Sequence, residues 1–136
     1  MNSDIILKAG GIIIKDKKFA LERHGGKDVY ILPGGKLEHG ESFEQALIRE
    51  LMEEFGIEVL IKDIEKIGDF ESRAVHIPDK RVKVTAFIVK KWKNEIVLDD
   101  GLEEILWVNT LNINEFKVSP IVKEIFPLLV SRGLID

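Results

Sequence analysis

Residues 35–57 read GKLEHGESFEQALIRELMEEFGI, and the second half of this stretch has the pattern of a helix. Ser42 precedes Gln45 by three positions, a spacing that lets the two side chains satisfy each other's unpaired backbone amides at a helix start. Gly56 ends the pattern, because glycine adopts the left-handed conformation of a helix C-cap without a side-chain clash. The sequence therefore predicts a helix over residues 43–55.

The predicted helix has two different faces. Its apolar side chains gather on one side at about 100° per residue, and we expect them to pack into a core: Leu47, Ile48, Leu51, Met52 and Phe55. Glu50, Glu53 and Glu54 gather within another arc, where like charges repel. Such a run, taken alone, is usually the solvated face of an amphipathic helix. A divalent cation would turn the repulsion into attraction, and oxygen ligands suit Mg²⁺ or Mn²⁺ better than zinc.

The spacing of the whole stretch is more specific than its helix. It reads G-x5-E-x7-R-E-L-x-E-E-x-G-I, and chance agreement at any given start is on the order of one in a billion. At every defining position it resembles the signature of the Nudix hydrolases, enzymes that hydrolyse a nucleoside diphosphate linked to another moiety. The resemblance is strongest over this stretch and extends more weakly over most of the chain.

The resemblance implies roles for individual residues of the motif. Glu50, Glu53 and Glu54 would hold divalent metal. Arg49 would orient a neighbouring glutamate, and the backbone at Gly35 would approach the metal. The spacing independently places Arg49 beside Glu53, at i and i+4. Glu53 or Glu54 would accept the proton of an attacking water, and three adjacent carboxylates that share protons and a cation leave that choice open.

Outside the motif, the resemblance points to two further places. Arg23 ends a predicted strand and resembles a basic residue that reaches substrate phosphate in many Nudix enzymes, although a surface arginine explains it equally well. Glu103 and Glu104 precede a predicted strand, where related enzymes often place another glutamate as metal ligand or general base. Glu103 is the candidate metal ligand, and an acidic surface loop is the alternative.

The flanking segments predict strands on both sides of the helix. These cover residues 5–15, 18–23, 29–32, 58–70, 81–92 and 105–108, and a closing helix covers residues 120–131. A turn is expected at Pro33–Gly35, and Gly10 with Gly11 indicates a bulge or a close backbone approach. Because several strands follow one another directly, a simple parallel βαβ repeat is excluded. The resemblance makes the α/β class specific, as a mixed β-sheet sandwiched between α-helices.

Composition limits the remaining possibilities. The 136 residues, 45% hydrophobic and 32% charged, predict a single domain over residues 1–136. There is no cysteine, so disulfides and thiolate metal sites are excluded. No long apolar run or targeting pattern is visible, so we expect a soluble cytoplasmic protein without a membrane partner. The net charge of −4 does not indicate a nucleic acid polymer as partner, and a homodimer is left open.

These features favour an Mg²⁺-dependent pyrophosphohydrolase that acts on a small nucleotide. Residues 72–74 lack the proline of ADP-ribose hydrolases, and Val75 and His76 stand near the tyrosine position of dinucleoside polyphosphate hydrolases. The resemblance therefore favours a MutT-like enzyme that cleaves a nucleoside triphosphate to monophosphate and pyrophosphate. Val118 replaces the asparagine with which MutT reads oxidised guanine, which argues against 8-oxo-dGTP specificity.

Other functions are compatible with the same residues. The enzyme alternatives are hydrolysis of ADP-ribose, of a nucleotide sugar or of a dinucleoside polyphosphate. A nucleotide sensor without catalysis would be expected to have a damaged motif, and none of the defining residues is lost. A structural domain with an acidic helix is the last alternative, and stabilisation by metal would separate it from the others.

Overall fold

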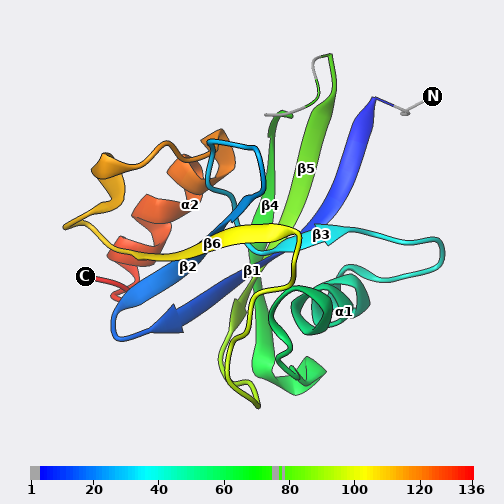
Figure 1. Ribbon diagram of the computed structural model, residues 1–136, viewed down its shortest axis with the longest axis horizontal. Helices are drawn as coiled ribbons and strands as arrows, with labels where there is room; N and C mark the ends of the chain where they lie inside the picture. Colours follow the sequence, from blue (N-terminus) through cyan, green and yellow to red (C-terminus); the bar gives the residue numbers. More distant parts are fainter. Residues whose placement is uncertain (1–3, 75–76, 78) are drawn as a thin grey trace.

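The computed structural model describes residues 4–74, 77 and 79–136, and one mixed β-sheet forms its centre (Figure 1). Over these residues the strands are β1 (Ile5–Lys15), β2 (Lys18–His24), β3 (Gly34–Lys36), β4 (Ile64–Arg73), β5 (Arg81–Val89) and β6 (Leu102–Val108). The helices are α1 (Phe43–Phe55) and α2 (Pro120–Ser131), with short 3-10 turns at Ile61–Asp63 and Ile113–Glu115. The strand order is β4-β5-β1-β2-β6, and β3 pairs with β1.

Strand β1 belongs to both halves of the sheet. It pairs in parallel with β5 and antiparallel with β3, and its last residues pair antiparallel with β2. The β1–β2 turn has positive φ at both Asp16 and Lys17, as in the mirror-image turns that suit hairpins. A Cβ on Gly10 would lie 2.8 Å from Val84 Cγ1, so the space beside this glycine is filled by a side chain of β5.

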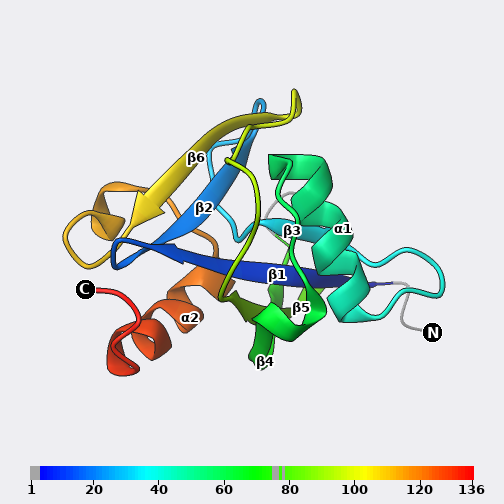
Figure 2. The same ribbon diagram turned by 90° about the horizontal axis from the view of Figure 1, so that it is seen from below.

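The two helices cover opposite faces of the sheet, as Figure 2 shows. Buried side chains beneath α1 form one cluster that includes Ile13, Leu47, Leu51, Phe55 and Phe87. Buried side chains beneath α2 form another that includes Phe19, Leu21, Val122, Ile125 and Leu129. The predicted fold, a mixed sheet between helices, is confirmed. In the described part of the chain, no helix is long and apolar enough to cross a membrane.

Helix α1 forms over the predicted residues. Its start is the predicted capping box, in which Gln45 N donates to Ser42 Oγ at 3.1 Å and Ser42 N donates to Gln45 Oε1 at 2.9 Å. Gly56 adopts the left-handed C-cap conformation, with φ of 69°. The expected core position of Met52 is wrong, because this side chain is 45% exposed. Only the side of α1 that faces the strands is covered, and its fully buried residues are Ala46, Leu47, Leu51 and Phe55.

The predicted strand at residues 29–32 is wrong. Only isolated bridges occur there, at Tyr30 and Ile31, and the strand forms at Gly34–Lys36, inside and beyond the predicted turn. The glycines explain this difference, since a Cβ on Gly34 would lie 2.0 Å from the carbonyl oxygen of Ala9 on β1. Glycine therefore permits the close pairing of β3 with β1.

Four other strands differ from their predicted bounds. The strand expected over residues 18–23 continues by one residue, to His24. The strand expected over residues 58–70 begins at Ile64, because a 3-10 turn precedes it, and it continues to Arg73. The strand expected over residues 81–92 ends at Val89, which pairs with Ile64 at the start of β4. The last strand begins at Leu102, before the predicted residue 105. The closing helix α2 has the predicted bounds, with Ser119 as its N-cap.

Candidate functional site

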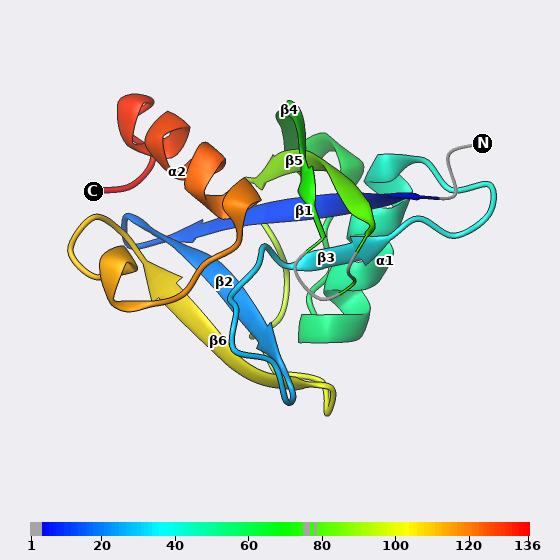
Figure 3. The ribbon, with the colours of Figure 1, turned by 90° about the horizontal axis from the view of Figure 1, so that it is seen from above.

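Strand β3 separates the glutamates of α1 from a pocket, and Figure 3 shows this strand beside β1, with the helix behind both. On the helix side, Gly34 N donates to Glu54 Oε1 at 3.0 Å. A Cβ on Gly35 would lie 2.4 Å from Glu50 Cδ, so the Glu50 carboxylate rests directly against the backbone of β3. On the other side, Gly34, Gly35 and Lys36 line a pocket of about 140 Å³. The motif therefore contributes to both the acidic side and the pocket side of one strand.

Arg49 gathers three glutamates of the motif. Its guanidinium donates to the two carboxylate oxygens of Glu41 at 2.7 and 2.9 Å, and to Glu50 Oε1 at 2.9 Å. The predicted pair with Glu53 is confirmed at 3.3 Å, although the Glu53 side chain is 57% exposed. These hydrogen bonds from Arg49 lower the pKa of Glu41 to about 2. Arg49 also donates to the carbonyl of Lys36 at 3.1 Å, which ties the helix to the loop after β3.

Glu54 points away from Arg49 into a buried acidic group made with Glu22 and His24 of β2. Glu22 is 0% exposed, and its Oε2 lies 2.8 Å from His24 Nε2. Glu54 is 8% exposed, and its Oε2 lies 3.9 Å from the same nitrogen. Burial raises the pKa of both carboxyl groups, and the charge of Glu22 raises that of Glu54 further. We refer to these three residues as the Glu22–His24–Glu54 group.

The expected single arc of carboxylates is therefore divided. Glu50 and Glu53 contact Arg49, whereas Glu54 faces β2 and β3. The division arises because Glu54 lies on the side of the helix that is covered by the sheet, while Glu53 lies on its exposed side. Helical spacing alone does not separate these two environments.

Arg23 and Glu103 form an ion pair at the edge where β2 meets β6. The Arg23 guanidinium donates to Glu103 and, at 3.2 Å, to Glu104, and it lies over the ring of Tyr30 at 5.7 Å. Glu103 lies inside β6, which begins at Leu102, so the expected position in a loop before the strand is wrong. In this structure Glu103 is a partner of Arg23 and is not part of the Glu22–His24–Glu54 group.

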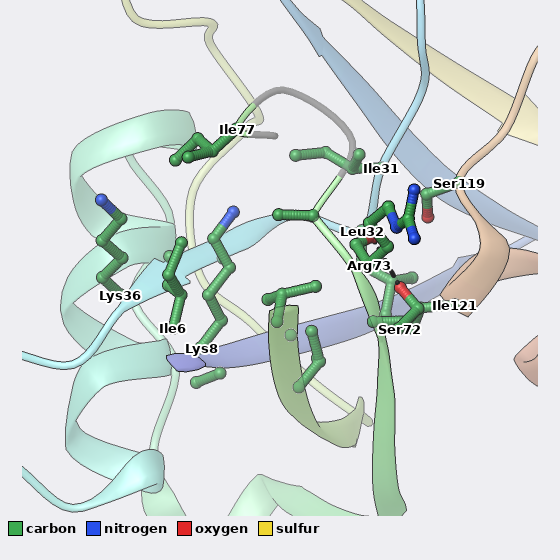
Figure 4. A pocket seen from close by; sticks show the side chains of 17 residues that line it. Ile6, Lys8, Ile31, Leu32, Lys36, Ser72, Arg73, Ile77, Ser119 and Ile121 are labelled. Atoms are coloured by element: carbon green, nitrogen blue, oxygen red, sulfur yellow. Dashed lines mark hydrogen bonds between the residues drawn. The ribbon is translucent and has the colours of Figure 1, made fainter. Parts of the chain in front are cut away.

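The pocket beyond β3 combines an apolar lining with positive charges (Figure 4). Lys8, Lys36 and Arg73 line it among aliphatic side chains, and burial lowers the pKa of Lys8. Ser119 also lines the pocket, while its neighbour Val118 is 8% exposed and buried beside it in the chain. Such a pocket suits a ligand with an apolar body and negative charge.

The pocket also includes residues that bear on the substrate. Residues 72–74, which lack the proline expected of ADP-ribose hydrolases, line it together with Ile77. Val75 and His76, which bear on the distinction from dinucleoside polyphosphate hydrolases, lie outside the described residues.

Glu22 and His24 are site residues that the sequence analysis missed. Alternation with Phe19 and Leu21 gives Glu22 the appearance of a solvent-facing strand residue. Ala20, on the same face as Glu22, is also fully buried, so both faces of β2 are covered. The unbroken apolar run before Glu22 was the available signal, since such runs are typical of strands buried on both faces.

Comparison with known proteins matches residues 6–129 to the NUDIX domain. A Proteus vulgaris protein named 8-oxo-dGTP diphosphatase is 42% identical over 69 residues, which cover 51% of this chain and 57% of that protein. A Haemophilus influenzae protein of the same name is 34% identical over 113 residues, or 79% of each chain. A Methanocaldococcus jannaschii protein named ADP-ribose pyrophosphatase is 40% identical over 106 residues, which cover 76% of this chain and 61% of that protein.

Among solved structures, the fold resembles that of a MutT protein from Methanosarcina mazei Go1. The TM-score is 0.78, at 20% sequence identity, and the match covers 98% of both chains. At this identity the structural likeness establishes the fold alone. The family follows instead from the NUDIX domain match, which covers most of the present chain.

Proposed function

The chain belongs to the NUDIX family, and we propose that it is a metal-dependent pyrophosphohydrolase of nucleoside triphosphates. The reaction would add water to the triphosphate and release a nucleoside monophosphate and pyrophosphate. One observation carries the proposal: β3 has the motif glutamates on one side and a cation-lined pocket on the other. The relatives named 8-oxo-dGTP diphosphatase support the same class of substrate.

The residues around Gly35 fit a hard divalent cation. The Glu50 carboxylate lies in a space that a Cβ at position 35 would fill. We propose that Glu50, Glu53, Glu54 and the backbone of Gly35 hold Mg²⁺, with Mn²⁺ as the alternative, because carboxylate and carbonyl oxygens suit these ions. Glu103 remains a proposed further ligand, and it would have to leave its ion pair with Arg23.

The proposed chemistry follows from the charge of the substrate. When bound, the cation would neutralise phosphate charge and acidify the attacking water. Arg49 keeps Glu50 in position through its 2.9 Å hydrogen bond, so its role is that of a positioning residue. Glu53 or Glu54 accepts the proton of the attacking water. Arg23 would contact a phosphate group, and the acidic side chains that now bind it would be displaced.

The nucleoside would occupy the pocket on the other side of β3. Its aliphatic lining offers a surface for a base or ribose, and Lys8, Lys36 and Arg73 add positive charge for the phosphate chain. Val118 has no polar side-chain atom and is 8% exposed, so it cannot donate a hydrogen bond to an oxidised guanine. The proposed substrate is therefore a nucleoside triphosphate without that base preference. The proposal involves small nucleotides and no nucleic acid polymer.

ADP-ribose is the second candidate substrate. The Methanocaldococcus jannaschii relative carries the name ADP-ribose pyrophosphatase and is 40% identical over 106 residues. Both substrates contain the phosphoric anhydride that the proposed metal site would bind. The missing proline in residues 72–74 places nucleoside triphosphates ahead of ADP-ribose.

A substrate panel tests the proposal. The protein would be incubated with Mg²⁺ and nucleoside triphosphates, ADP-ribose, nucleotide sugars or dinucleoside polyphosphates, and the products would be separated by anion-exchange chromatography. We expect nucleoside monophosphate and pyrophosphate from a nucleoside triphosphate, with no turnover in EDTA. Preferred cleavage of ADP-ribose would select the second candidate. Bound Mg²⁺ without cleavage of any substrate would overturn the proposed activity.

A further inference from the structure

The Glu22–His24–Glu54 group has the dimensions of a cation site. One ligand atom from each residue lies within 4.8 Å of the others, and two of the separations are 2.8 and 3.9 Å. An ion about 2.1 Å from its ligands holds neighbouring ligand atoms about 3 Å apart and opposite ones about 4.2 Å apart. The three side chains therefore need little rearrangement to coordinate one ion.

One carboxylate oxygen of Glu22 lacks a hydrogen-bond partner, and a bound ligand could supply one. The residue is 0% exposed, and its Oε1 has no hydrogen-bond partner among the residues that the structure describes. A buried carboxylate oxygen without a donor is costly, and a coordinated cation removes that cost. Lys8 interacts electrostatically with Glu22 and Glu54 but forms no salt bridge with either in the described part of the chain.

The other two residues leave the group open to an ion. Glu54 uses Oε1 to accept a hydrogen bond from Gly34 N, and its Oε2 faces His24. The His24 side chain is 43% exposed, which provides a route from solvent to the buried carboxylates. One oxygen of each glutamate and one imidazole nitrogen thus lie close together, and a bound ion would replace the hydrogen bond between Glu22 Oε2 and His24 Nε2.

We propose that Glu22, His24 and Glu54 bind a first-row transition-metal dication, such as Mn²⁺ or Zn²⁺. An imidazole nitrogen favours these ions over Mg²⁺, which prefers an all-oxygen environment. This position is separate from the oxygen site around Gly35 but shares Glu54 with it. The inference rests on the proposed function only through that shared residue.

Electron paramagnetic resonance with Mn²⁺ tests the inference directly. In protein without a histidine tag, we expect bound Mn²⁺ with the ¹⁴N modulation that imidazole coordination produces in pulsed spectra. His24→Asn should abolish this modulation and weaken the site at least about tenfold, the lower range for losing even an outer partner of a metal ligand. His39→Asn is the matched control, because His39 is exposed in the loop after β3, and it should keep the signal.

A second variant and a competition experiment complete the test. Glu22→Gln should weaken the nitrogen-coordinated Mn²⁺ to a similar degree, with circular dichroism as the check on folding. Excess Mg²⁺ should displace Mn²⁺ from the oxygen site and leave the ¹⁴N-modulated signal. Modulation that persists in His24→Asn, or bound Mn²⁺ without modulation in the unmodified protein, would overturn the inference.

The two proposals can fail separately. An unmodified protein that hydrolyses nucleotides with Mg²⁺ but shows no nitrogen coordination overturns this inference alone. A protein with nitrogen-coordinated Mn²⁺ and no hydrolysis of the panel overturns the proposed activity alone. The spectroscopic result does not depend on which nucleotide is the substrate.

Discussion

The carboxylates around Arg49 and those around Glu22 differ in what neutralises them. The first set shares one guanidinium and includes Glu41, Glu50 and Glu53. In the Glu22–His24–Glu54 group, by contrast, the described residues include no arginine or lysine ion pair to either glutamate. The Arg49 set can therefore hold its shape without a ligand, whereas the buried group needs a proton or a cation. The motif thus contributes glutamates to both sets: those held by Arg49, and Glu54, which needs a proton or a cation.

Substitution of Glu54 should have the largest effect on activity. We expect Glu54→Gln to lower the Mg²⁺-dependent rate by about 10² to 10⁴, because the proposed site loses a ligand or a proton acceptor. Glu53→Gln should also abolish most hydrolysis, although its exposed side chain predicts no loss of stability. The measurement is pyrophosphate release, with circular dichroism to confirm folding. Glu124→Gln, an exposed position on α2, is the control, and normal turnover in both site variants would exclude the proposed site.

The adjacent glycines of β3 should separate function from stability. The nearest atoms to a Cβ at position 35 belong to the flexible end of Glu50, so Gly35→Ala should leave the protein folded. The displaced carboxylate should lower the rate by about 100-fold, the effect of roughly 1 Å of misplacement. Gly34→Ala instead meets the backbone of Ala9, and φ of 137° at Gly34 disfavours any side chain, so we expect a loss of about 3 kcal/mol. Thermal unfolding and turnover would be measured for both variants. If Gly35→Ala were inactive and as unstable as Gly34→Ala, the two glycines would not separate function from stability.

Helix α1 shows what the sequence could predict. Ser42, Gln45 and Gly56 act on backbone groups within one helical turn, so their spacing was sufficient to give both ends of the helix. The Arg49–Glu53 pair is local in the same way, at i and i+4. Interactions of this range depend little on how the rest of the chain packs.

The buried acidic group and β3 could not be predicted in that way. The meeting of Glu22 with Glu54 depends on how β2 packs near α1, and no periodicity in either segment specifies it. Strand β3 contains two glycines, which have low strand propensity, and it forms because their missing Cβ atoms admit β1 and the Glu50 carboxylate. Tertiary packing therefore determined the part of the site that the sequence analysis missed.

A smaller effect is expected from Arg49→Lys. Lysine cannot reproduce the forked hydrogen bonds to Glu41 and Glu50, so the free energy of unfolding should fall by about 1 to 3 kcal/mol. Urea unfolding in EDTA measures this loss without a contribution from metal. Arg132→Lys, at an exposed position after α2, should change stability by less than about 0.5 kcal/mol. Equal effects of the two substitutions would show that the Arg49 set does not support the fold.

The Glu22–His24–Glu54 group should also make stability depend on pH. The pKa values of Glu22 and Glu54 are raised above the ordinary 4.5, so above that pH the folded state binds more protons than the unfolded state. The free energy of unfolding in EDTA should therefore fall as pH rises from 5 to 8. The pKa of Glu41 is about 2, so this carboxylate is ionised in the folded state over that range. In the unfolded state it is largely ionised above pH 5, so Glu41 adds little slope.

Two changes should reduce this slope, and both act on the buried group. Glu22→Gln keeps the size of the side chain but removes one of the two carboxyls that take up protons on folding. Mn²⁺ should stabilise the unmodified protein more at pH 8 than at pH 5, because a cation binds the ionised carboxylates and competes with protons. Urea unfolding at each pH measures both effects, and Glu41→Gln serves as the comparison from the Arg49 set. If Glu41→Gln reduced the pH dependence of the free energy of unfolding and Glu22→Gln did not, this dependence would not come from the buried carboxyl groups.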